Sequence, residues 1–346
     1  MRNLPSVAIC IPTFNQAQYL PISVGSACQQ IYPNIEVWVS DDASTDDTPE
    51  VMDRLCEQFP QAHYYRQPKN LGMVGNNNWL LRQLKAEFIV RIDSDDFLLP
   101  NYVERLVDLL QKYPDAGYAH TAVWEIDERG EKQGVRQLAR IEEFREADKE
   151  LRAAVSGFRM TANIAMFRSK ALQRLNFYQG RPEFTQDYDL IVRMADAGYG
   201  NVYTSEILAG YRVWTDTELI RPRRKRVELQ GMIRVYEESL LTAFQKRGWD
   251  TKFIEQQRQK LALNHAAFCY NPFFSEAERS ELIELLQELG DSPALQIRLW
   301  TMRLGLAPFW EWQYQTLLKL KALVKFWLHK LSITKDNYRF NFNHQK

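Results

Sequence analysis

The sequence predicts an α/β protein with a mostly parallel sheet, helices on both faces of that sheet, and a helical carboxy-terminal region. Two observations support the sheet. From residue 6 to about 115, short apolar runs alternate with segments of helical periodicity, and polar residues follow each apolar run. Such alternation is typical of strand–helix–strand units. From about residue 223 the composition shifts toward long helical segments, which predicts the second region.

The apolar runs are expected to be strands, and the segments between them helices. The four strands are expected at Val7–Ile11, Ile35–Ser40, His63–Arg66 and Phe88–Ile92. The helices are expected near residues 17–30, 47–59, 74–85 and 101–112. Parallel strands end at a common edge of the sheet, where ligands of open α/β sheets bind. We therefore expect the four polar loops to line one crevice.

Further elements are expected beyond residue 115. Residues 117–126 predict a longer strand that ends in a turn at 127–130. Residues 141–155 predict a polar helix, and residues 161–168 another strand. A helix with acids in its first turn is expected at 186–195.

Composition excludes several classes of protein. The 346 residues include 44 basic and 44 acidic side chains, so no whole-molecule attraction to nucleic acid is expected. The four cysteines form no C-x-x-C pair, which argues against a zinc knuckle or a disulfide framework. The first apolar run meets Pro12 too soon for a signal peptide, and no run approaches the ~20 apolar residues of a membrane span. A cytoplasmic location is expected.

The most informative segment is Asp93–Asp96, directly after the fourth expected strand, with three acids in four positions. Carboxylates this close repel one another unless a cation lies between them. Hard oxygen ligands at a strand end suit Mg²⁺ or Mn²⁺ bound together with phosphates. Asp and Ser are also good helix N-caps, which explains one or two of these residues but not all. The segment predicts metal and phosphate chemistry.

Five segments together resemble family 2 glycosyltransferases, which are inverting enzymes of the Rossmann-like, A-type glycosyltransferase fold. The segments are Ile11–Asn15, Asp41–Asp46, Asn70–Gly72, Asp93–Asp96 and Gln186–Asp189. The resemblance covers roughly residues 6–215 and is specific because the motifs are in register. It implies a catalytic domain at 1–220 and a helical region at 221–346. Within the domain, the nucleotide-sugar half would span about 6–115 and the acceptor half about 116–220.

The resemblance implies roles for the motif residues. The nucleotide-sugar would be bound by Pro12, Thr13, Phe14, Asn15, Asp42, Asn70, Gly72, Asp93 and Ser94. Asp42 would accept a hydrogen bond from the imide N–H of uracil or thymine. Asp95, supported by Asp93, would bind Mn²⁺ or Mg²⁺. Asp187 would be the general base that takes the proton of the acceptor hydroxyl.

Plainer interpretations compete with these roles. Asp41 and Asp42 also suit a turn, and the segment Asn70–Gly72 suits a turn as well as a nucleotide contact. Asp187 and Asp189 also suit the first turn of a helix, where acids complement the helix dipole. With the motifs taken together, we favour Asp187 as the base and a structural role for Asp189.

Two residues depart from the family pattern. Gln186 stands where the family commonly has Glu, so a second carboxylate beside Asp187 is absent. Trp214 ends a segment that in the family often ends in a metal-ligating His. An indole N–H cannot ligate a cation, so metal binding would rest on Asp95, the diphosphate and water. Trp214 would either stack on a sugar or the acceptor, or only pack.

The resemblance implies a metal-dependent, inverting glycosyltransferase of the hexosyltransferase type. It would move a sugar from a nucleotide-diphosphate donor, with UDP- or dTDP-sugars favoured, to a hydroxyl of a glycan or lipid-linked glycan in cell-surface polysaccharide synthesis. The two departures leave an alternative, a catalytically degenerate nucleotide-sugar-binding protein. A sugar nucleotidyltransferase would need a Gly-rich, basic loop after the first strand, and Pro12–Asn15 is not such a loop.

Two basic segments suggest contacts with anions. Five cations within residues 221–226 fit a lid over the diphosphate, a lipid contact, or simply an exposed loop. In residues 317–331 an apolar stripe lies opposite lysines, which fits a helix in an anionic membrane interface or a helix packed on the catalytic domain. The first alternative would place the protein peripherally on the inner face of the cell membrane.

Overall fold

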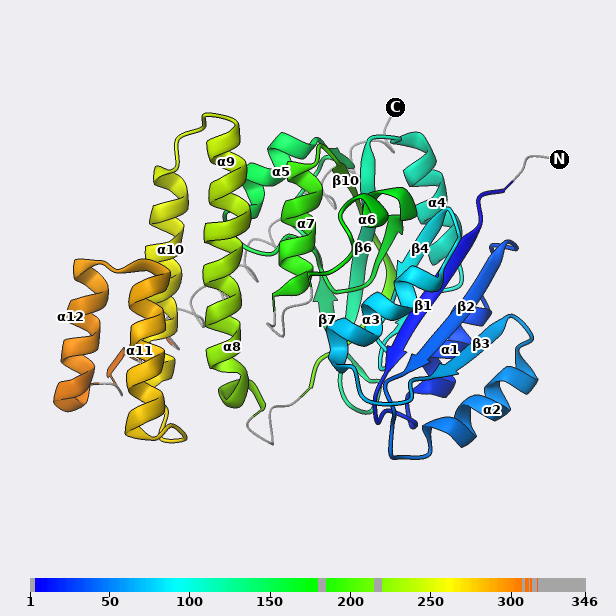
Figure 1. Cartoon of the computed structure of the whole chain (residues 1–346), viewed down its shortest axis with the longest axis horizontal. Helices are drawn as coiled ribbons and strands as arrows, with labels where there is room; N and C mark the ends of the chain where they lie inside the picture. The colour runs from blue at the N-terminus through cyan, green and yellow to red at the C-terminus, as the bar shows by residue number, and fades with distance from the viewer. Residues whose placement is uncertain are drawn as a thin grey trace, which may run out of the picture. The chain divides into compact units, whose positions relative to one another are not determined.

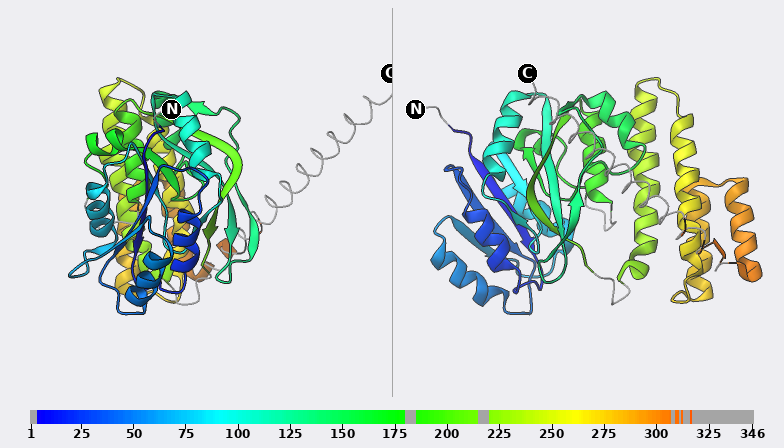
Figure 2. Two further views of the ribbon diagram at one scale, coloured as in Figure 1. Left: turned by 90° about the vertical axis from the view of Figure 1, so that its right-hand side faces the viewer. Right: turned by 180° about the vertical axis from the view of Figure 1, so that it is seen from behind.

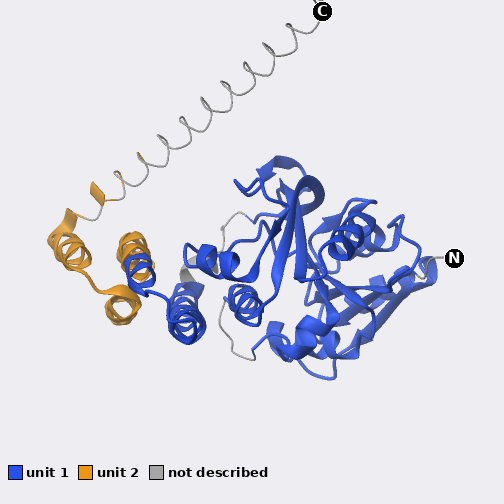
Figure 3. Cartoon of the chain, turned by 90° about the horizontal axis from the view of Figure 1, so that it is seen from above, with its two compact units in different colours: residues 1–257 blue, residues 258–346 orange. Residues whose placement is uncertain are grey.

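The computed structural model describes residues 4–179, 185–214 and 220–306, together with the single residues 309, 310, 312 and 316. By internal contacts the chain divides into two compact units, residues 1–257 and residues 258–346 (Figure 3). A catalytic domain that ends at residue 220, as the resemblance implies, would lie entirely within the first unit. That boundary stays a prediction.

The first part of the chain forms the parallel half of the sheet (Figure 1). Its strands are β1 (Val7–Thr13), β2 (Ile35–Asp41), β3 (Ala62–Arg66) and β4 (Phe88–Arg91), in the order β3-β2-β1-β4. Its helices are α1 (Leu20–Cys28), α2 (Thr48–Gln58), α3 (Gly72–Gln83) and α4 (Tyr102–Lys112). All eight elements were expected, and the α/β fold class is confirmed.

The other half of the sheet is mixed. It contains β5 (Phe97–Leu98), β6 (Ala116–Ile126), β9 (Ala165–Arg168) and β10 (Gly200–Arg212), and the order continues as β4-β9-β6-β10-β5. Strand β9 is antiparallel to β4 and β6, whereas β10 runs parallel to β6. The long strands β6 and β10, in shades of green, lie side by side when the sheet is seen from behind (Figure 2). The short strands β7 (Lys132–Arg136) and β8 (Phe144–Arg145) pair antiparallel with β6 and β10. The antiparallel pairs were not predicted.

The helix expected at 141–155 is shorter than predicted. Helix α5 covers only Ala147–Ala154, because Phe144 and Arg145 pair with β10 as strand β8. The Phe144 ring stacks on Tyr113 at a centroid distance of 5.1 Å. Helices α6 (Ser169–Arg174) and α7 (Gln186–Asp196) follow, and α7 matches the helix expected at 186–195.

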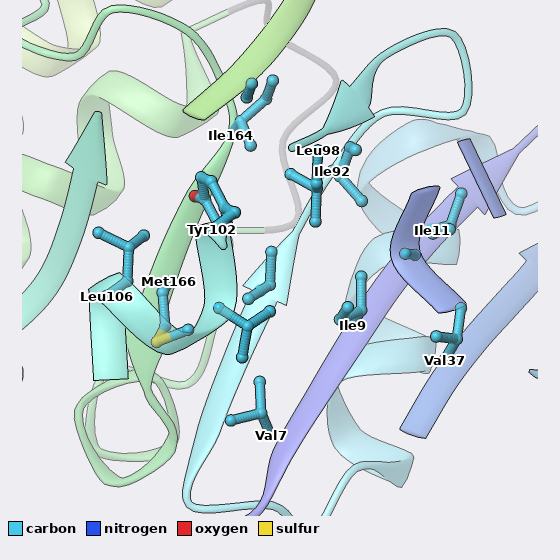
Figure 4. Close-up of a cluster of buried hydrophobic side chains, with 14 of the residues drawn as sticks. Val7, Ile9, Ile11, Val37, Ile92, Leu98, Tyr102, Leu106, Ile164 and Met166 are labelled. Carbon is cyan, nitrogen blue, oxygen red and sulfur yellow. The ribbon is translucent and has the colours of Figure 1, made fainter. Parts of the chain in front are cut away.

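A large cluster of buried apolar side chains lies on one face of the sheet (Figure 4). Val7, Ile9 and Ile11 of β1 alternate with residues of the other face and join buried side chains of α1, α2 and α4, such as Tyr102 and Leu106. Helix α3 contacts β1 and β2, and its buried leucines are not part of this cluster. Helices therefore cover both faces of the sheet, as predicted.

The described chain from residue 220 to residue 306 is mainly helical. Helix α8 (Ile220–Arg234) continues through the π-helical segment Val235–Leu241 into α9 (Thr242–Lys246), and α10 (Lys252–His265) follows. In the second unit, helices α11 (Glu276–Gly290) and α12 (Pro293–Thr301) lie beyond the short 3₁₀ helix Ala266–Tyr270.

Residues 221–226 do not form the exposed loop that is one of the alternatives offered by the sequence. Their backbone forms the start of α8, and Lys225 is buried and forms an ion pair with Glu228 at 2.7 Å. Among the described residues, no helix combines the length and the apolar character needed to cross a bilayer. The apolar stripe at 317–331 lies outside the described residues, so the membrane contact stays a prediction.

Candidate active site

The loops after β1 and β2 are tied together at the carboxyl edge of the sheet. Asn15, which has a left-handed backbone with φ of 53°, donates its N–H to Ser44 Oγ at 2.9 Å. Its side-chain Oδ1 accepts the N–H of Thr45 at 2.8 Å. The buried carboxylate of Asp41 accepts from the N–H and the hydroxyl of Ser44 and from the Tyr64 hydroxyl. Asp41 therefore supports the loop.

Asp42 connects three of the loops. Its backbone N–H donates to the carbonyl of Thr13 at 2.9 Å, and its Oδ1 accepts the N–H of Leu71 at 2.6 Å. Asn70 donates from Nδ2 to the carbonyl of Asp42, while its own Oδ1 accepts the N–H of Gly72. No hydrogen bond from another described residue reaches Oδ2 of Asp42. That oxygen is available to a ligand.

The other expected nucleotide-binding residues lie at the same edge. Pro12 pairs with Ser40 of β2, and Thr13, which ends that register, is buried with no hydrogen-bond partner for Oγ1 among the described residues. Phe14 is 47% exposed. Ser94 donates from Oγ to Gln16 Oε1 at 2.6 Å, which joins the loop after β4 to the loop after β1. All four polar loops therefore meet, as predicted.

Asp93 is held by a buried arginine that precedes it on β4. Arg91 donates from Nη2 to Asp93 Oδ1 at 2.6 Å and from Nη1 to Oδ2 at 3.3 Å. The Arg91 side chain is 3% exposed, and Nη1 also donates to the carbonyl of Asn163 at 3.1 Å. Because both carboxylate oxygens accept from one guanidinium fork, Asp93 has a single orientation.

Asp95 has an aromatic partner. Trp214 donates from Nε1 to Asp95 Oδ2 at 2.7 Å, and its ring lies edge-on to Tyr19 with 5.5 Å between centroids. Arg212 donates from Nε to the backbone carbonyl of Asp95 at 3.0 Å. Burial and the neighbouring Asp93 raise the pKa of Asp95, and the Trp214 hydrogen bond acts against this rise.

Asp96 is the most deeply buried acid of the segment. Its Oδ1 accepts the backbone N–H of Arg212 at 2.8 Å, and its Oδ2 has no partner among the described residues. Burial, with the nearby charges of Asp95 and Asp93, raises the pKa of Asp96 well above its ordinary value. The accumulated negative charge of this loop is therefore only partly compensated by the chain itself.

These acids fit a divalent cation that shares its ligands with a diphosphate. In the part of the chain that the structure describes, no three His, Cys, Asp or Glu side chains form a set that could hold an ion by themselves. Mg²⁺ and Mn²⁺ commonly bind through one or two carboxylates plus phosphates and water. Arg91 occupies both oxygens of Asp93, whereas Trp214 engages one oxygen of Asp95. Asp95 is therefore the better placed ligand.

Asp187 lies in the first turn of α7. The Tyr178 hydroxyl donates to Asp187 Oδ1 at 3.0 Å. Burial is the main cause that raises the pKa of Asp187; Asp93 raises it further, and the charge of Arg91 lowers it. Asp189 pairs with Arg193 at 2.6 Å, an arrangement in keeping with the structural role expected for it.

An open cleft of about 490 Å³ lies next to the start of α7, although Asp187 itself is not one of its lining residues. It is lined by the first turn of α3, by Asn78 and by Tyr178 and Gln186. Gln186 is 8% exposed, and its Oε1 has no partner among the described residues. A buried amide oxygen that lines a cleft can accept a hydrogen bond from a ligand.

Two residues of this site were missed in the sequence. Arg91 is a charged residue inside the apolar run Phe88–Ile92, and a cation in a buried strand needs an anionic partner. The charged residue inside an apolar run could therefore have identified Arg91 from the sequence. Tyr178 lies in a loop rich in Gly, Arg and Pro, and no local pattern distinguishes it.

Comparisons with known proteins give a consistent result. Residues 8–175 match the family model described as glycosyl transferase family 2. A chondroitin synthase from Escherichia coli is 33% identical over 130 residues, which cover 38% of this chain and 19% of that protein. The match thus spans about a fifth of that relative's length.

Two solved structures resemble the fold. Residues 1–349 of TarS from S. aureus in complex with UDP-GlcNAc superpose with a TM-score of 0.55 at 13% identity, covering 87% of this chain and 92% of that one. A mannosyltransferase from Pyrobaculum calidifontis in complex with GDP-Man and Mn²⁺ gives a TM-score of 0.54 at 18% identity, with coverage of 89% and 84%. At these identities the likeness shows the fold alone.

Proposed function

Because residues 8–175 place this chain in glycosyl transferase family 2, we propose that it moves a sugar, with inversion, from a nucleotide-diphosphate donor to a hydroxyl of a glycan or lipid-linked glycan. The observation that carries the proposal is the convergence of four strand-end loops, with Asp42 and Asp95, at one sheet edge. The name of the Escherichia coli relative supports a role in polysaccharide synthesis.

The donor base and ribose would lie against Pro12–Asn15, Asn70 and Gly72. The unengaged Oδ2 of Asp42 suits an imide N–H flanked by carbonyls, as in uracil or thymine. Guanine carries an imide-like N–H as well, with a carbonyl on one side only. Of the structures with a similar fold, TarS is seen with UDP-GlcNAc and the mannosyltransferase with GDP-Man. We favour a UDP- or dTDP-sugar, and the experiment below includes GDP.

Asp95, with Asp93 oriented by Arg91 beside it, would hold Mn²⁺ or Mg²⁺ against the donor diphosphate. When bound, the cation offsets the charge that develops on the departing diphosphate. Ser94, which is fixed to Gln16, would present its loop to the phosphates. The Mn²⁺ complex of the mannosyltransferase supports this assignment by analogy of fold.

Asp187 would act as the general base. The acceptor would lie in the cleft at the start of α7 with its hydroxyl directed at Asp187. The hydroxyl would give its proton to the carboxylate and attack the anomeric carbon on the face opposite the diphosphate. The bond to the diphosphate then breaks as the new glycosidic bond forms, which inverts the anomeric configuration. Burial makes Asp187 a stronger base than an exposed aspartate, because burial raises its pKa.

A thermal-shift screen tests the donor site. Purified protein is heated with UDP, dTDP, GDP or CMP, each with Mn²⁺, Mg²⁺ or EDTA, since a ligand that binds only the folded state raises the melting temperature. We expect a metal-dependent rise with one nucleoside diphosphate and loss of that rise in Asp95→Ala. No rise with any nucleotide would contradict the proposed donor site.

A second candidate function is a nucleotide-sugar-binding protein without transferase activity. It is motivated by Gln186, which lacks the carboxylate of the family pattern, and by Trp214, which occupies an oxygen of Asp95. Binding of a nucleotide-sugar without transfer to any acceptor, and without slow hydrolysis of the donor, would favour this function over the enzyme.

A further inference from the structure

The two residues before Tyr178 have an uncommon backbone. Asn176 and Phe177 have φ values of 52° and 59°, in the left-handed region. Asn tolerates that region, but a bulky residue such as Phe rarely adopts it. Such conformations persist only where the surrounding structure enforces them, and they often occur at functional sites.

Two helices hold this segment in place. Asn78 of α3 uses its whole amide on the backbone of Tyr178: Nδ2 donates to the Tyr178 carbonyl at 2.8 Å, and Oδ1 accepts the Tyr178 N–H at 3.1 Å. Arg193 of α7 donates to the carbonyls of Leu175 and Phe177 at 3.1 and 3.0 Å. Two side chains that are distant in the chain therefore hold this backbone. Asn78 lies 100 residues before Tyr178, and Arg193 lies 16 residues after Phe177.

The fixed segment directs the Tyr178 hydroxyl at Asp187. Tyr178 is 3% exposed, and its O–H donates to Asp187 Oδ1 at 3.0 Å. Burial, with the charge of Asp187, raises the pKa of Tyr178 well above its ordinary value, so the hydroxyl remains protonated and acts as a donor. Asn78 and Tyr178 both line the cleft at the start of α7.

We infer that Tyr178 is a positioning residue for Asp187: Asn78 and Arg193 hold its backbone so that its hydroxyl binds Oδ1 and leaves Oδ2 to receive the proton of the acceptor. The inference rests on the proposed role of Asp187 as the base. It predicts that Tyr178 affects the chemical step through Asp187 and has little effect on the donor.

The charged groups around Asp187 determine how its pKa responds. Arg91 of β4 lowers the pKa, Asp93 raises it, and the Tyr178 hydrogen bond lowers it by stabilising the ionised form. Loss of the Tyr178 hydroxyl therefore raises the pKa of Asp187. The acid side of the kcat profile moves to higher pH.

The test measures sugar transfer by the unsubstituted protein, by Tyr178→Phe, by Asp187→Asn and by the double variant. The donor is the one that the thermal-shift screen identifies. We expect Tyr178→Phe to lower kcat on the order of 10-fold, with the donor KM within about twofold, because one hydrogen bond to a charged group is lost. In the Asp187→Asn background, Tyr178→Phe should have no further effect. Tyr32→Phe is the matched control, since its buried hydroxyl donates to the Pro5 carbonyl at 2.7 Å, at the opposite edge of the sheet.

Each outcome is decisive. An unchanged kcat in Tyr178→Phe, or an equal loss in both backgrounds, would overturn the positioning role. Near-normal transfer by Asp187→Asn would instead overturn the base assignment, and the inference with it. Asn78→Ala is a second, independent test. Alone, it should reproduce the loss of kcat and the shifted pH profile of Tyr178→Phe. Combined with Tyr178→Phe, it should cause little further loss of kcat. Additive losses would contradict the inference.

Discussion

The indole N–H of Trp214 donates a 2.7 Å hydrogen bond to Oδ2 of Asp95. The bond joins the end of the β10 segment to the loop after β4, residues that are 119 positions apart. Trp214 is 42% exposed, with its ring against Tyr19 and its N–H on the acid best placed to bind a cation. The indole N–H therefore occupies one of the two oxygens with which Asp95 could bind a cation.

Trp214→Phe should strengthen cation binding. The change keeps an aromatic ring against Tyr19 but frees Oδ2 of Asp95, so we expect the Kd for Mn²⁺, measured by calorimetry with bound nucleoside diphosphate, to fall about 3- to 10-fold. Trp38→Phe is the matched control, because Trp38 also donates its indole N–H to a carboxylate, Glu36, at 2.9 Å. A weaker affinity in Trp214→Phe would mean that the indole holds Asp95 in its binding orientation.

Asp41 and Asp42 should differ in what they support. Asp42→Asn keeps an oxygen for the Leu71 N–H but replaces the carboxylate oxygen proposed to face the nucleobase with an amide N–H donor. We therefore expect nucleotide affinity to fall at least about 10-fold with little change in melting temperature. Asp41→Asn removes a buried charge that accepts several hydrogen bonds, so it should lower the free energy of unfolding by about 1–3 kcal/mol. Calorimetry and urea denaturation separate the two effects. Unchanged nucleotide affinity in Asp42→Asn would leave Asp42 as a turn residue.

Asp96→Asn should stabilise the metal-free protein in a pH-dependent way. The pKa of Asp96 is raised in the folded state, so its contribution to the free energy of unfolding falls as pH rises through that pKa. The variant should resemble the wild type near pH 4 and exceed it at pH 8 by about 1–3 kcal/mol, the cost of an unsatisfied buried group. Urea denaturation in EDTA measures this difference, and the exposed Asp108→Asn is the control. An equal difference at both pH values would exclude the charge of Asp96 as the cause.

Gln186→Glu should move the acid side of the activity profile. A second carboxylate beside Asp187 disfavours its ionised form, so the pKa of Asp187 rises further and the ionised base is lost at a higher pH on acidification. We expect kcat to fall several-fold at pH 5.5 and to change less than about twofold at pH 8. The exposed Gln179→Glu, which places the same charge elsewhere in the cleft, controls for bulk charge. A uniform loss at all pH values would point to a lost substrate contact instead.

The parallel half of the fold was predictable from local patterns. The apolar runs of β1 to β4 and the periodic segments between them identify a parallel α/β sheet, because strands of this type need crossover helices and buried faces. Strand β10 was missed, since Gly200–Arg212 mixes polar and apolar residues without clear alternation. Its pairing with β6 and β5 depends on contacts between residues far apart in the chain, which local patterns do not contain.

The order of strands and loops along the chain is enough to predict which residues gather at the site, because a loop that follows a parallel strand can only lie at that strand's carboxyl edge. Asp42, Asp93 and Asp95 are therefore expected together from the sequence alone. Their hydrogen-bond partners follow only from the tertiary structure. Trp214 on Asp95 and Tyr178 on Asp187 depend on segments brought in from other strands and loops, and a hydrogen bond requires distances near 3 Å that spacing along the chain does not specify.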